Sequence, residues 1–246
     1  MTSNALLTFD ILLLIARPAA GKSEIIHHLK NTPIDDRIER FQIGSFVELD
    51  DFPMLWTWFE EDALLEEMGH PRLHSSPDQY FKEKYLWNLL IERLSLEYSK
   101  LLRDQPEFHR EGTVILEFAR GSEHGGYREA FQHLSREIAE KLAILYVDVS
   151  WEESLRKNRA RYNPERPDSI LEHGLSDEKM ETLYREIDWE DLIKDHPAAI
   201  PIQGLDVPYT VFENHDDVTT LGGNALSKRL EKVLGELYEK YQVGKK

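Results

Sequence analysis

The chain has 246 residues, which fits one α/β domain with insertions, so we expect residues 1–246 to form a single domain. Its 30 Lys and Arg against 46 Asp and Glu give a formal net charge of -16, which argues against a broad nucleic-acid surface or an anionic membrane as a partner. The absence of cysteine excludes disulfides and thiolate metal sites.

The first residues and the apolar runs bear on where we expect the protein to be found. Residues 1–9 lack the basic start of a signal peptide, and the longest wholly apolar run, residues 11–16, is too short to cross a bilayer. We therefore expect a cytoplasmic protein without a membrane partner, whose oligomeric state these patterns do not indicate.

The first predicted element is a buried parallel strand over residues 11–15, a short run of branched aliphatic side chains. Residues 23–29 then read as the opening of a helix. The loop between them is a Walker A pattern in which Ala16 replaces the first glycine, a change that costs nothing if this position keeps a negative φ. Its sequence is Ala16-Arg17-Pro18-Ala19-Ala20-Gly21-Lys22-Ser23.

A loop of this kind binds phosphate because its backbone N–H groups converge at the positive end of a helix. We therefore expect all eight residues of the loop to bind ATP. Lys22 would place its ammonium near the β- and γ-phosphates, where it also serves catalysis, and Ser23 would offer its hydroxyl to Mg²⁺. ATP and Mg²⁺ are thus the expected ligands.

A second strand is predicted over residues 41–49, and two acids follow it. Asp50 and Asp51 would stand where the chain leaves the sheet, near the phosphate loop, and either could contact the substrate and accept the proton of an attacking hydroxyl. The alternative is that Asp51 caps a helix and Asp50 is solvated.

Residues 52–112 are predicted to form a helical insertion that caps the substrate, because a short crossover would need far fewer residues. Ser76 as N-cap, Pro77 at the first helical position and Gln79 in a capping box predict a helix start, and an apolar face continues over residues 81–101. Core packing is the favoured role of the aromatic residues here, and stacking on a planar substrate is the alternative. These residues are Trp56, Trp58, Phe59, Tyr80, Tyr85 and Trp87.

The third strand, residues 113–118, resembles a Walker B element because it is apolar and carries Glu117 near its end. Glu117 is a candidate for holding Mg²⁺ and for contacting substrate, and Arg120 is a second candidate substrate contact. A simple ion pair between Glu117 and Arg120 is the alternative. Residues 121–126 form a glycine-rich loop that could close on the substrate.

A helix over 129–145 and a fourth strand over 142–149 come next, followed by a cluster of cations in this acidic chain. Arg156 and Arg159 are candidate catalytic residues and Arg161 a candidate nucleotide contact, because guanidinium groups clamp phosphate oxygens. A solvated basic helix face is the alternative. Residues 162–178 are a candidate lid that would exclude water.

A fifth strand over 209–212 and a covering helix over 226–241 complete the pattern. Alternating strands and helices predict an α/β fold in three layers, with a five-stranded parallel sheet and ligands at the carboxyl ends of the strands.

The order of these motifs resembles the P-loop small-molecule kinases, particularly the uridine kinase and nicotinamide riboside kinase group, and nucleotide monophosphate kinases share the framework. The resemblance implies a P-loop NTPase fold and ATP-dependent transfer of the γ-phosphoryl group to a hydroxyl or phosphate of a nucleoside-, nucleotide- or sugar-like acceptor, with Asp50 as the base. Phe118-Ala119 in place of a glycine and the long insertion depart from the family. The matching residues are Ala16 to Ser23, Asp50-Asp51-Phe52, Glu117, Val147-Asp148, Arg156, Arg159 and Arg161.

Other classes fit the sequence less well. The Asn-Lys-x-Asp and Asp-x-x-Gly strings of GTPases are absent, and Leu221-Gly222-Gly223-Asn224 is a poor match to an ABC signature. Pro71 interrupts the spacing of His70 and His74, so a metal-dependent hydrolase is not indicated. The remaining alternative is an ATP-binding regulatory or interaction protein that transfers no phosphoryl group to a small molecule.

Overall fold

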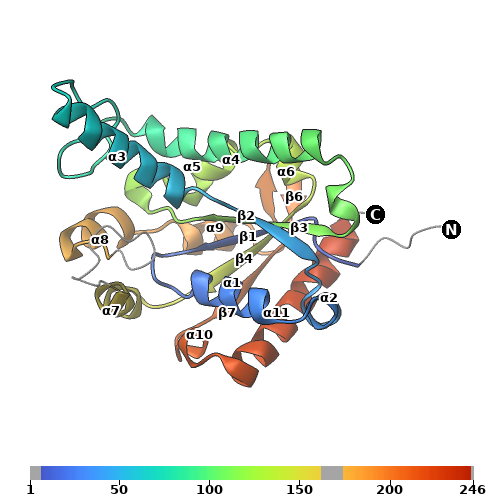
Figure 1. The fold of residues 1–246 in the computed structure, drawn as a ribbon. Helices are drawn as coiled ribbons and strands as arrows, with labels where there is room; N and C mark the ends of the chain where they lie inside the picture. The colour runs from blue at the N-terminus through green and yellow to red at the C-terminus, as the bar shows by residue number, and fades with distance from the viewer. Residues whose placement is uncertain (1–6, 162–173, 245–246) are drawn as a thin grey trace.

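The computed structural model describes residues 7–161 and 174–244, and its centre is a five-stranded parallel sheet in the order β2-β3-β1-β4-β7 (Figure 1). This confirms the predicted α/β fold with a parallel sheet. A short antiparallel pair, β5 (Ile200–Ile202) and β6 (Leu205–Val207), stands apart from the main sheet. The five strands are β1 (Ile11–Ala16), β2 (Ser45–Asp50), β3 (Gly112–Phe118), β4 (Leu142–Asp148) and β7 (Tyr209–Glu213).

The central strands are continuous apolar runs because helices cover both of their faces. Every residue of β1 is buried, whereas β2, at the edge of the sheet, is mostly exposed or half-buried. Alternate residues of β1 enter different cores: Ile11 and Leu13 pack on one face, and Leu12 and Leu14 on the other. This is the period of two that a strand imposes on its side chains.

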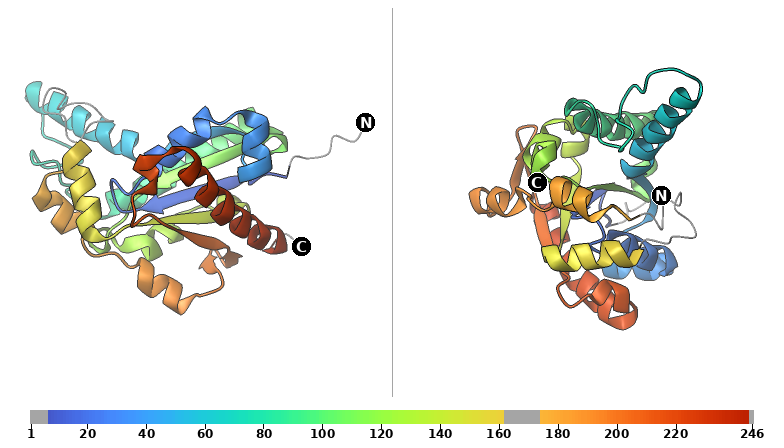
Figure 2. Two further views of the ribbon diagram at one scale, coloured as in Figure 1. Left: turned by 90° about the horizontal axis from the view of Figure 1, so that it is seen from below. Right: turned by 90° about the vertical axis from the view of Figure 1, so that its left-hand side faces the viewer.

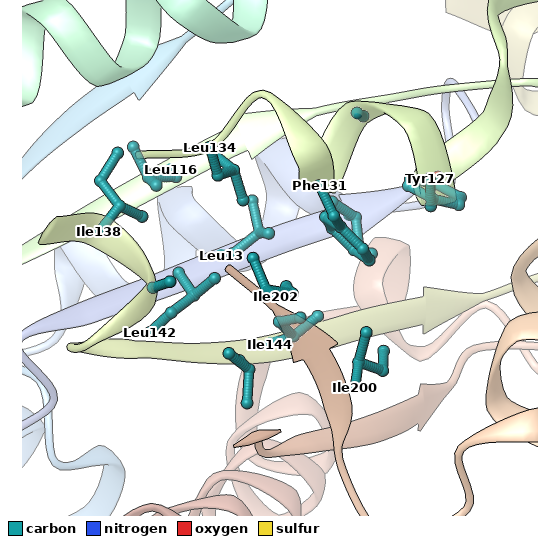
Figure 3. Close-up of a cluster of buried hydrophobic side chains, with 14 of the residues drawn as sticks. Leu13, Leu116, Tyr127, Phe131, Leu134, Ile138, Leu142, Ile144, Ile200 and Ile202 are labelled. Carbon is teal, nitrogen blue, oxygen red and sulfur yellow. The ribbon is translucent and has the colours of Figure 1, made fainter. Parts of the chain in front are cut away.

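One face of the sheet packs against α4 (Tyr85–Asp104), α5 (Gly126–Gln132), α6 (Arg136–Ala139) and α9 (Trp189–Asp195). Figure 3 shows Leu13, Leu116 and Ile144 from three strands meeting side chains of α5, α6 and β5. The other face packs against α1 (Lys22–Asn31), α2 (Ile34–Phe41), α10 (Val218–Leu221) and α11 (Gly223–Gly244). Helices therefore flank the sheet on both sides, as the predicted three layers require (Figure 2).

The segment between β2 and β3 holds α3 (Phe52–Glu67), α4 and the short η1 (Phe108–Arg110). It has a small apolar cluster of its own, separate from the two cores beside the sheet, with Leu55, Trp56, Phe59, Trp87 and Leu90 at its centre. Asp62 of α3 is fully buried and accepts hydrogen bonds from the amides of Leu73, His74 and Ser75. The loop after α3 is thus folded around one carboxylate.

The predicted helix start at Ser76 is wrong, because α4 begins only at Tyr85. The Ser76 hydroxyl accepts the Tyr80 amide at 3.2 Å, Ser75 bridges Phe81, and Gln79 has a φ of 59°, outside the helical region. The serine therefore closes a local turn, a conformation that competes with helix capping.

Two other predicted boundaries are also wrong. Residues 129–145 do not form one helix: α5 ends at Gln132, Ser135 caps the separate α6 by accepting the Ile138 amide at 3.3 Å, and Leu142 already belongs to β4. The predicted strand over 41–49 begins too early, because Phe41 ends α2 and β2 starts at Ser45.

Two helices stand on either side of the candidate lid, residues 162–178. They are α7 (Trp151–Arg161) and α8 (Asp177–Tyr184), which begins with Ser176 accepting the Lys179 amide at 3.3 Å. Residues 162–173, the greater part of the candidate lid, lie outside the described residues. Within residues 7–161 and 174–244, none of the helices combines the length and apolar character needed to span a membrane.

Asp62→Asn should destabilise the chain by about 1–3 kcal/mol, because an amide cannot replace a carboxylate that accepts several buried hydrogen bonds. Burial raises the pKa of Asp62, but the bonds from Ser75, Leu73 and His74 outweigh it and hold the pKa below its usual value. This contribution to stability is therefore present above the unfolded-state pKa and lost as the pH falls through the folded-state pKa.

Urea unfolding at pH 7 measures the loss, and hydrogen exchange should locate it at residues 72–75. Glu61→Gln, on the exposed neighbour of Asp62, is the control and should change stability by less than about 0.5 kcal/mol. Equal midpoints for the Asp62 and Glu61 variants would contradict this role.

Candidate active site

A cavity of about 690 Å³ lies at the carboxyl ends of the strands. Its size is within the range typical of small-molecule sites, roughly 300–1,000 Å³. The loop after β1, the last residue of β2, the end of β3, and helices α3, α7 and α8 all contribute to its lining. This is where the alternating fold predicts ligands to bind.

The loop between β1 and α1 has the backbone shape of an anion cradle. Ala19 and Gly21 have positive φ values of 56° and 112°, and such alternation turns successive N–H groups inward. Ala16 does not have a positive φ and ends β1, which is the condition under which alanine can replace glycine there. Gly21 cannot carry a side chain, because a Cβ would lie 2.5 Å from the Thr219 hydroxyl oxygen.

Contacts from distant segments hold this loop. The Ser154 hydroxyl donates to the Pro18 carbonyl at 2.8 Å, and the Asn214 amide donates to the Ala20 carbonyl at 2.9 Å and to Thr219 Oγ1 at 2.8 Å. Ser154, Asn214 and Thr219 belong to no motif, so these roles could not be predicted from the sequence.

Arg17 and Ala16 differ from the other predicted nucleotide contacts. Pro18 to Ser23 line the cavity, whereas Ala16 and Arg17 do not. The Arg17 guanidinium instead donates to the carbonyl oxygens of Tyr184 and Arg185, at 3.3 and 3.1 Å. Arg17 thus ties the phosphate loop to the end of α8.

Three charged side chains predicted to act together do meet in the cavity lining. Asp50 and Glu117 are partners in the register of β2 and β3, and Glu117 Oε1 lies 3.7 Å from Lys22 Nζ. Lys22 is 8% exposed, so this contact is shielded from water. Glu117 therefore pairs with Lys22 and not with Arg120.

Burial raises the pKa values of both carboxyl groups. For Asp50, burial and the neighbouring Glu117 and Asp51 raise the pKa to about 8, although the Phe52 amide, which donates to Oδ1 at 3.0 Å, and Lys22 oppose the shift. Burial likewise raises the pKa of Glu117, and the Lys22 ammonium lowers it in part. Asp50 is thus not simply a solvated acid.

Asp51 and Arg120 form a buried ion pair outside the cavity lining, so the structure does not bring them to the position of a substrate contact. Arg120 Nη1 lies 2.6 Å from Asp51 Oδ2, and Arg120 Nη2 donates to the Trp87 carbonyl at 2.9 Å. Asp51 holds the N-cap position of α3, but its side chain makes no capping bond. The pair joins the ends of β2 and β3 to the start of α4.

The cations of α7 divide into two groups. Arg156, Lys157 and Arg161 line the cavity, and Arg161 Nη2 donates to the Ser23 hydroxyl at 3.2 Å. Arg159 does not line it, and its exposed side chain pairs with Asp177 at 2.6 Å.

Two cavity cations have acidic partners of their own. Arg156 lies 2.6 Å from Glu153 and 3.2 Å from Asp217. Lys157 is buried, pairs with Asp217 and donates to Thr219 Oγ1 at 3.2 Å. This role of Lys157 could not be predicted from the sequence, because its burial cannot be inferred from neighbouring residues.

Aromatic residues form another part of the cavity lining. They include Phe52, Trp56 and Phe59 of α3, Phe81 and Trp87, His124 of the loop 121–126 that is predicted to close on the substrate, and Tyr184, for which no role is predicted. Trp58 and Tyr85 are not part of it. Some of the predicted core aromatics therefore both pack together and face the cavity.

The donor set suits phosphate and Mg²⁺. The cradle of amides beside Lys22 fits a phosphate chain. Oxygen atoms of Ser23, Asp50 and Glu117 are the hard ligands that Mg²⁺ prefers, and this ion is commonly bound through one or two carboxylates together with substrate phosphates. The described residues contain no cluster of three or more histidines or acids that could hold a metal by themselves.

The sequence matches no protein-family model and no curated protein. Solved structures with a similar fold include a sugar kinase from Janibacter sp. HTCC2649, at 12% identity and a TM-score of 0.41, covering 94% of this chain and 98% of that one. TT1252 from Thermus thermophilus shows 18% identity and a TM-score of 0.45 over 94% and 98%. Shikimate kinase from Acinetobacter baumannii, in complex with shikimate, shows 14% and 0.43 over 96% and 97%. Likeness at this level transfers no function, which has to be inferred from the site.

Arg120→Met should destabilise the chain by about 3–5 kcal/mol, because it leaves the buried Asp51 carboxylate without a counter-charge. Urea unfolding at pH 7 measures the change. The double variant Arg120→Met/Asp51→Asn should recover part of the loss, since it removes the unpaired charge. A single variant with the wild-type midpoint would show that the pair has no structural role.

Asp50→Asn should stabilise the ligand-free protein more at pH 8 than at pH 5. The folded-state pKa of Asp50, about 8, lies above its unfolded-state value. At pH values between these two pKa values the folded state binds more protons than the unfolded state, so the stability of the wild-type protein falls as the pH rises. Removing the charge should raise Tm at pH 8 by about 2–4 °C or more, the shift for about 1 kcal/mol in a chain of this size.

Differential scanning calorimetry at both pH values tests this dependence on Asp50. Glu60→Gln, at an exposed position of α3, is the control and should give the same small difference at each pH. If the gain in Tm from Asp50→Asn did not grow with pH, ionisation of this carboxyl would cost the folded state little stability.

Proposed function

We propose that this protein is an ATP-dependent phosphotransferase that moves the γ-phosphoryl group to a hydroxyl of a small metabolite. One observation carries the proposal: Lys22 of the phosphate loop and the carboxyls of Asp50 and Glu117 line the same cavity, which continues along an aromatic wall. A donor subsite and an acceptor subsite can therefore share one enclosed space, as phosphoryl transfer requires.

Each part of the loop has a task in this reaction. The amides of residues 18–23 and the Lys22 ammonium would bind the phosphates and hold them against the end of β1. Ser23 and Glu117 would hold Mg²⁺, which when bound neutralises charge on the phosphate oxygens. Gly21 is needed because its backbone approaches Thr219 closely on one side and the phosphates on the other.

Asp50 is our candidate for the general base. It ends β2 beside Glu117, so an acceptor hydroxyl in the cavity could lie within reach of its carboxylate. A base works best when its pKa is near the working pH, and the pKa of about 8 is closer to neutrality than that of an ordinary aspartate. Lys22 favours the ionised form that accepts the proton.

Cations of α7 would balance the charge of the transferred group. Arg161 already contacts Ser23, and Arg156 lines the cavity, so both can reach a bound phosphate with a change of side-chain conformation. Arg159 pairs with Asp177 at the start of α8. Its proposed catalytic part would therefore require that pair to open.

Lys22→Ala should weaken ATP binding at least tenfold and abolish ADP release, because the phosphates lose their ammonium partner. Asp50→Asn should keep ATP binding within about threefold and lower acceptor-dependent ADP release by about 10²–10⁴, the usual contribution of a general base. Calorimetry with ATP and Mg²⁺ and a coupled ADP assay with candidate acceptors measure the two effects.

Lys232→Ala, on an exposed lysine of α11, is the matched control and should leave both readings unchanged. Full transfer by Asp50→Asn would contradict the assignment of the base. ATP binding that no acceptor converts into ADP release would instead indicate a nucleotide-binding regulatory protein.

A further inference from the structure

The segment between β2 and β3 gives the cavity a wall of aromatic rings. Phe52, Trp56 and Phe59 come from successive turns of α3, and Phe81 and Trp87 come from the loop before α4 and its first turn. These side chains belong to the separate apolar cluster of this segment. The cluster therefore packs α3 on α4 and also provides a surface that a ligand can contact.

The rings fix one another in defined orientations. Phe81 meets Trp87 edge to face, with centroids 4.8 Å apart and planes at 68°, and Phe59 lies 5.5 Å from Phe81. Trp56 packs against Phe59 at 6.5 Å. Such contacts stabilise a pair beyond the area that it buries. The wall is thus preorganised, and it offers ring faces and few polar atoms.

His124 adds one polar atom beside this wall. Its ring stacks on Trp87 with centroids 3.8 Å apart, and its Nδ1 accepts the Gly121 amide at 3.3 Å, so the proton belongs on Nε2. The side chain is 2% exposed, and Nε2 has no hydrogen-bond partner among the described residues. A buried donor left unpaired costs about 1–3 kcal/mol.

Histidine here is a neutral donor. Burial, together with the cations Arg120 and Lys84, lowers the pKa of His124 to about 2. Arg120 pairs with Asp51 and Lys84 pairs with Glu123, and neither carboxylate is a hydrogen-bond partner of His124 Nε2. A hydrogen-bond-accepting oxygen or nitrogen of a ligand is the partner that would satisfy it.

We propose that this wall is the acceptor subsite and that it selects a flat unsaturated ring bearing a hydrogen-bond-accepting atom at its edge. The ring stacks on the aromatic wall near Trp56, and a small displacement of Trp87 or Tyr184 brings its edge atom to the Nε2–H of His124. A sugar acid or other polyol is disfavoured, because its hydroxyl groups would be desolvated against ring carbons. This inference rests on the proposed function, because only a phosphotransferase has an acceptor. Binding of the ring can nevertheless be measured without phosphoryl transfer.

Two kinds of molecule have this chemistry: nucleosides, and pyridine rings that carry a hydroxymethyl group. Uridine, adenosine and pyridoxine are therefore the positive arm of the test, and gluconate and shikimate are the polyol arm. Calorimetry with each compound, in the absence of ATP and in its presence with Mg²⁺, should show binding for at least one flat ring and none for the polyols. Which flat ring binds tells the two sources apart.

Trp56→Leu and Trp58→Leu form a matched pair on the same helix. Trp56 lines the cavity, whereas Trp58 stacks on His74 at 4.9 Å and does not. Trp56→Leu should weaken binding of the flat ring at least tenfold, and Trp58→Leu should leave it within about twofold. Trp56→Phe keeps a ring and should retain most of the affinity, so a folding defect can be distinguished from a lost contact.

His124→Phe keeps the ring beside Trp87 but removes the donor, and it should lower the affinity about tenfold, the effect of about 1.4 kcal/mol. ATP binding should be unchanged in every variant, because none of these residues belongs to the phosphate loop. Tighter binding of the polyols, no binding of any flat ring, or equal effects of the two tryptophan variants would overturn the proposal. Failure of ATP to bind would instead overturn the proposed function. The titrations without ATP would still test whether the wall selects a flat ring.

Discussion

The parallel register of β1, β2 and β3 is the constraint on which the candidate site depends. Because these strands run in the same direction, their carboxyl ends meet at one edge of the sheet, and β1 continues there into the phosphate loop. Pairing of Asp50 with Glu117 follows directly from the register of β2 and β3. A slip of one residue would turn one of these side chains to the opposite face, so the apolar alternation that fixes the cores also fixes the chemistry.

The placement of individual cations at this edge explains how an acidic chain could bind an anion. The chain has an excess of 16 negative charges, but in the site Lys22 faces Glu117 and Arg161 contacts Ser23, and outside the cavity lining Arg120 neutralises Asp51. Each of these cations contacts a specific partner, and together they do not form a broad basic surface. In the proposed function, attraction for phosphate would therefore be local, and shielding from water would strengthen it because charge interactions are stronger away from solvent. The net negative charge argues against a broad surface for nucleic acid.

The parts of the structure that could be predicted from sequence are those with local signals. Apolar runs revealed the five strands, and the loop ending in Gly21-Lys22-Ser23 revealed the phosphate cradle. Sequence-based predictions failed where contacts with other segments determine the local structure. Ser76 closes a turn because Ser75 bridges Phe81, and the loop is held by Asn214 and Ser154 from segments far along the chain. The sequence predicts Arg120 as a substrate contact or as an ion-pair partner of Glu117, and only the packing of α4 shows it to be buried with Asp51.

The point at which α3 joins the sheet has a wider consequence. The helix starts at Phe52, immediately after Asp50 and Asp51, and the chain returns to the sheet only at Gly112, the first residue of β3. α3 packs mainly in its own apolar cluster, whereas the later turns of α4 belong to the core beside the sheet. α3 and the loop after it can therefore be lengthened, shortened or exchanged with the least effect on the strand that carries Glu117 and the loop that carries Lys22. Evolution could thus exchange this segment to change which molecule is recognised and inherit the phosphate chemistry intact, which makes the segment the natural target for redesigning the choice of substrate.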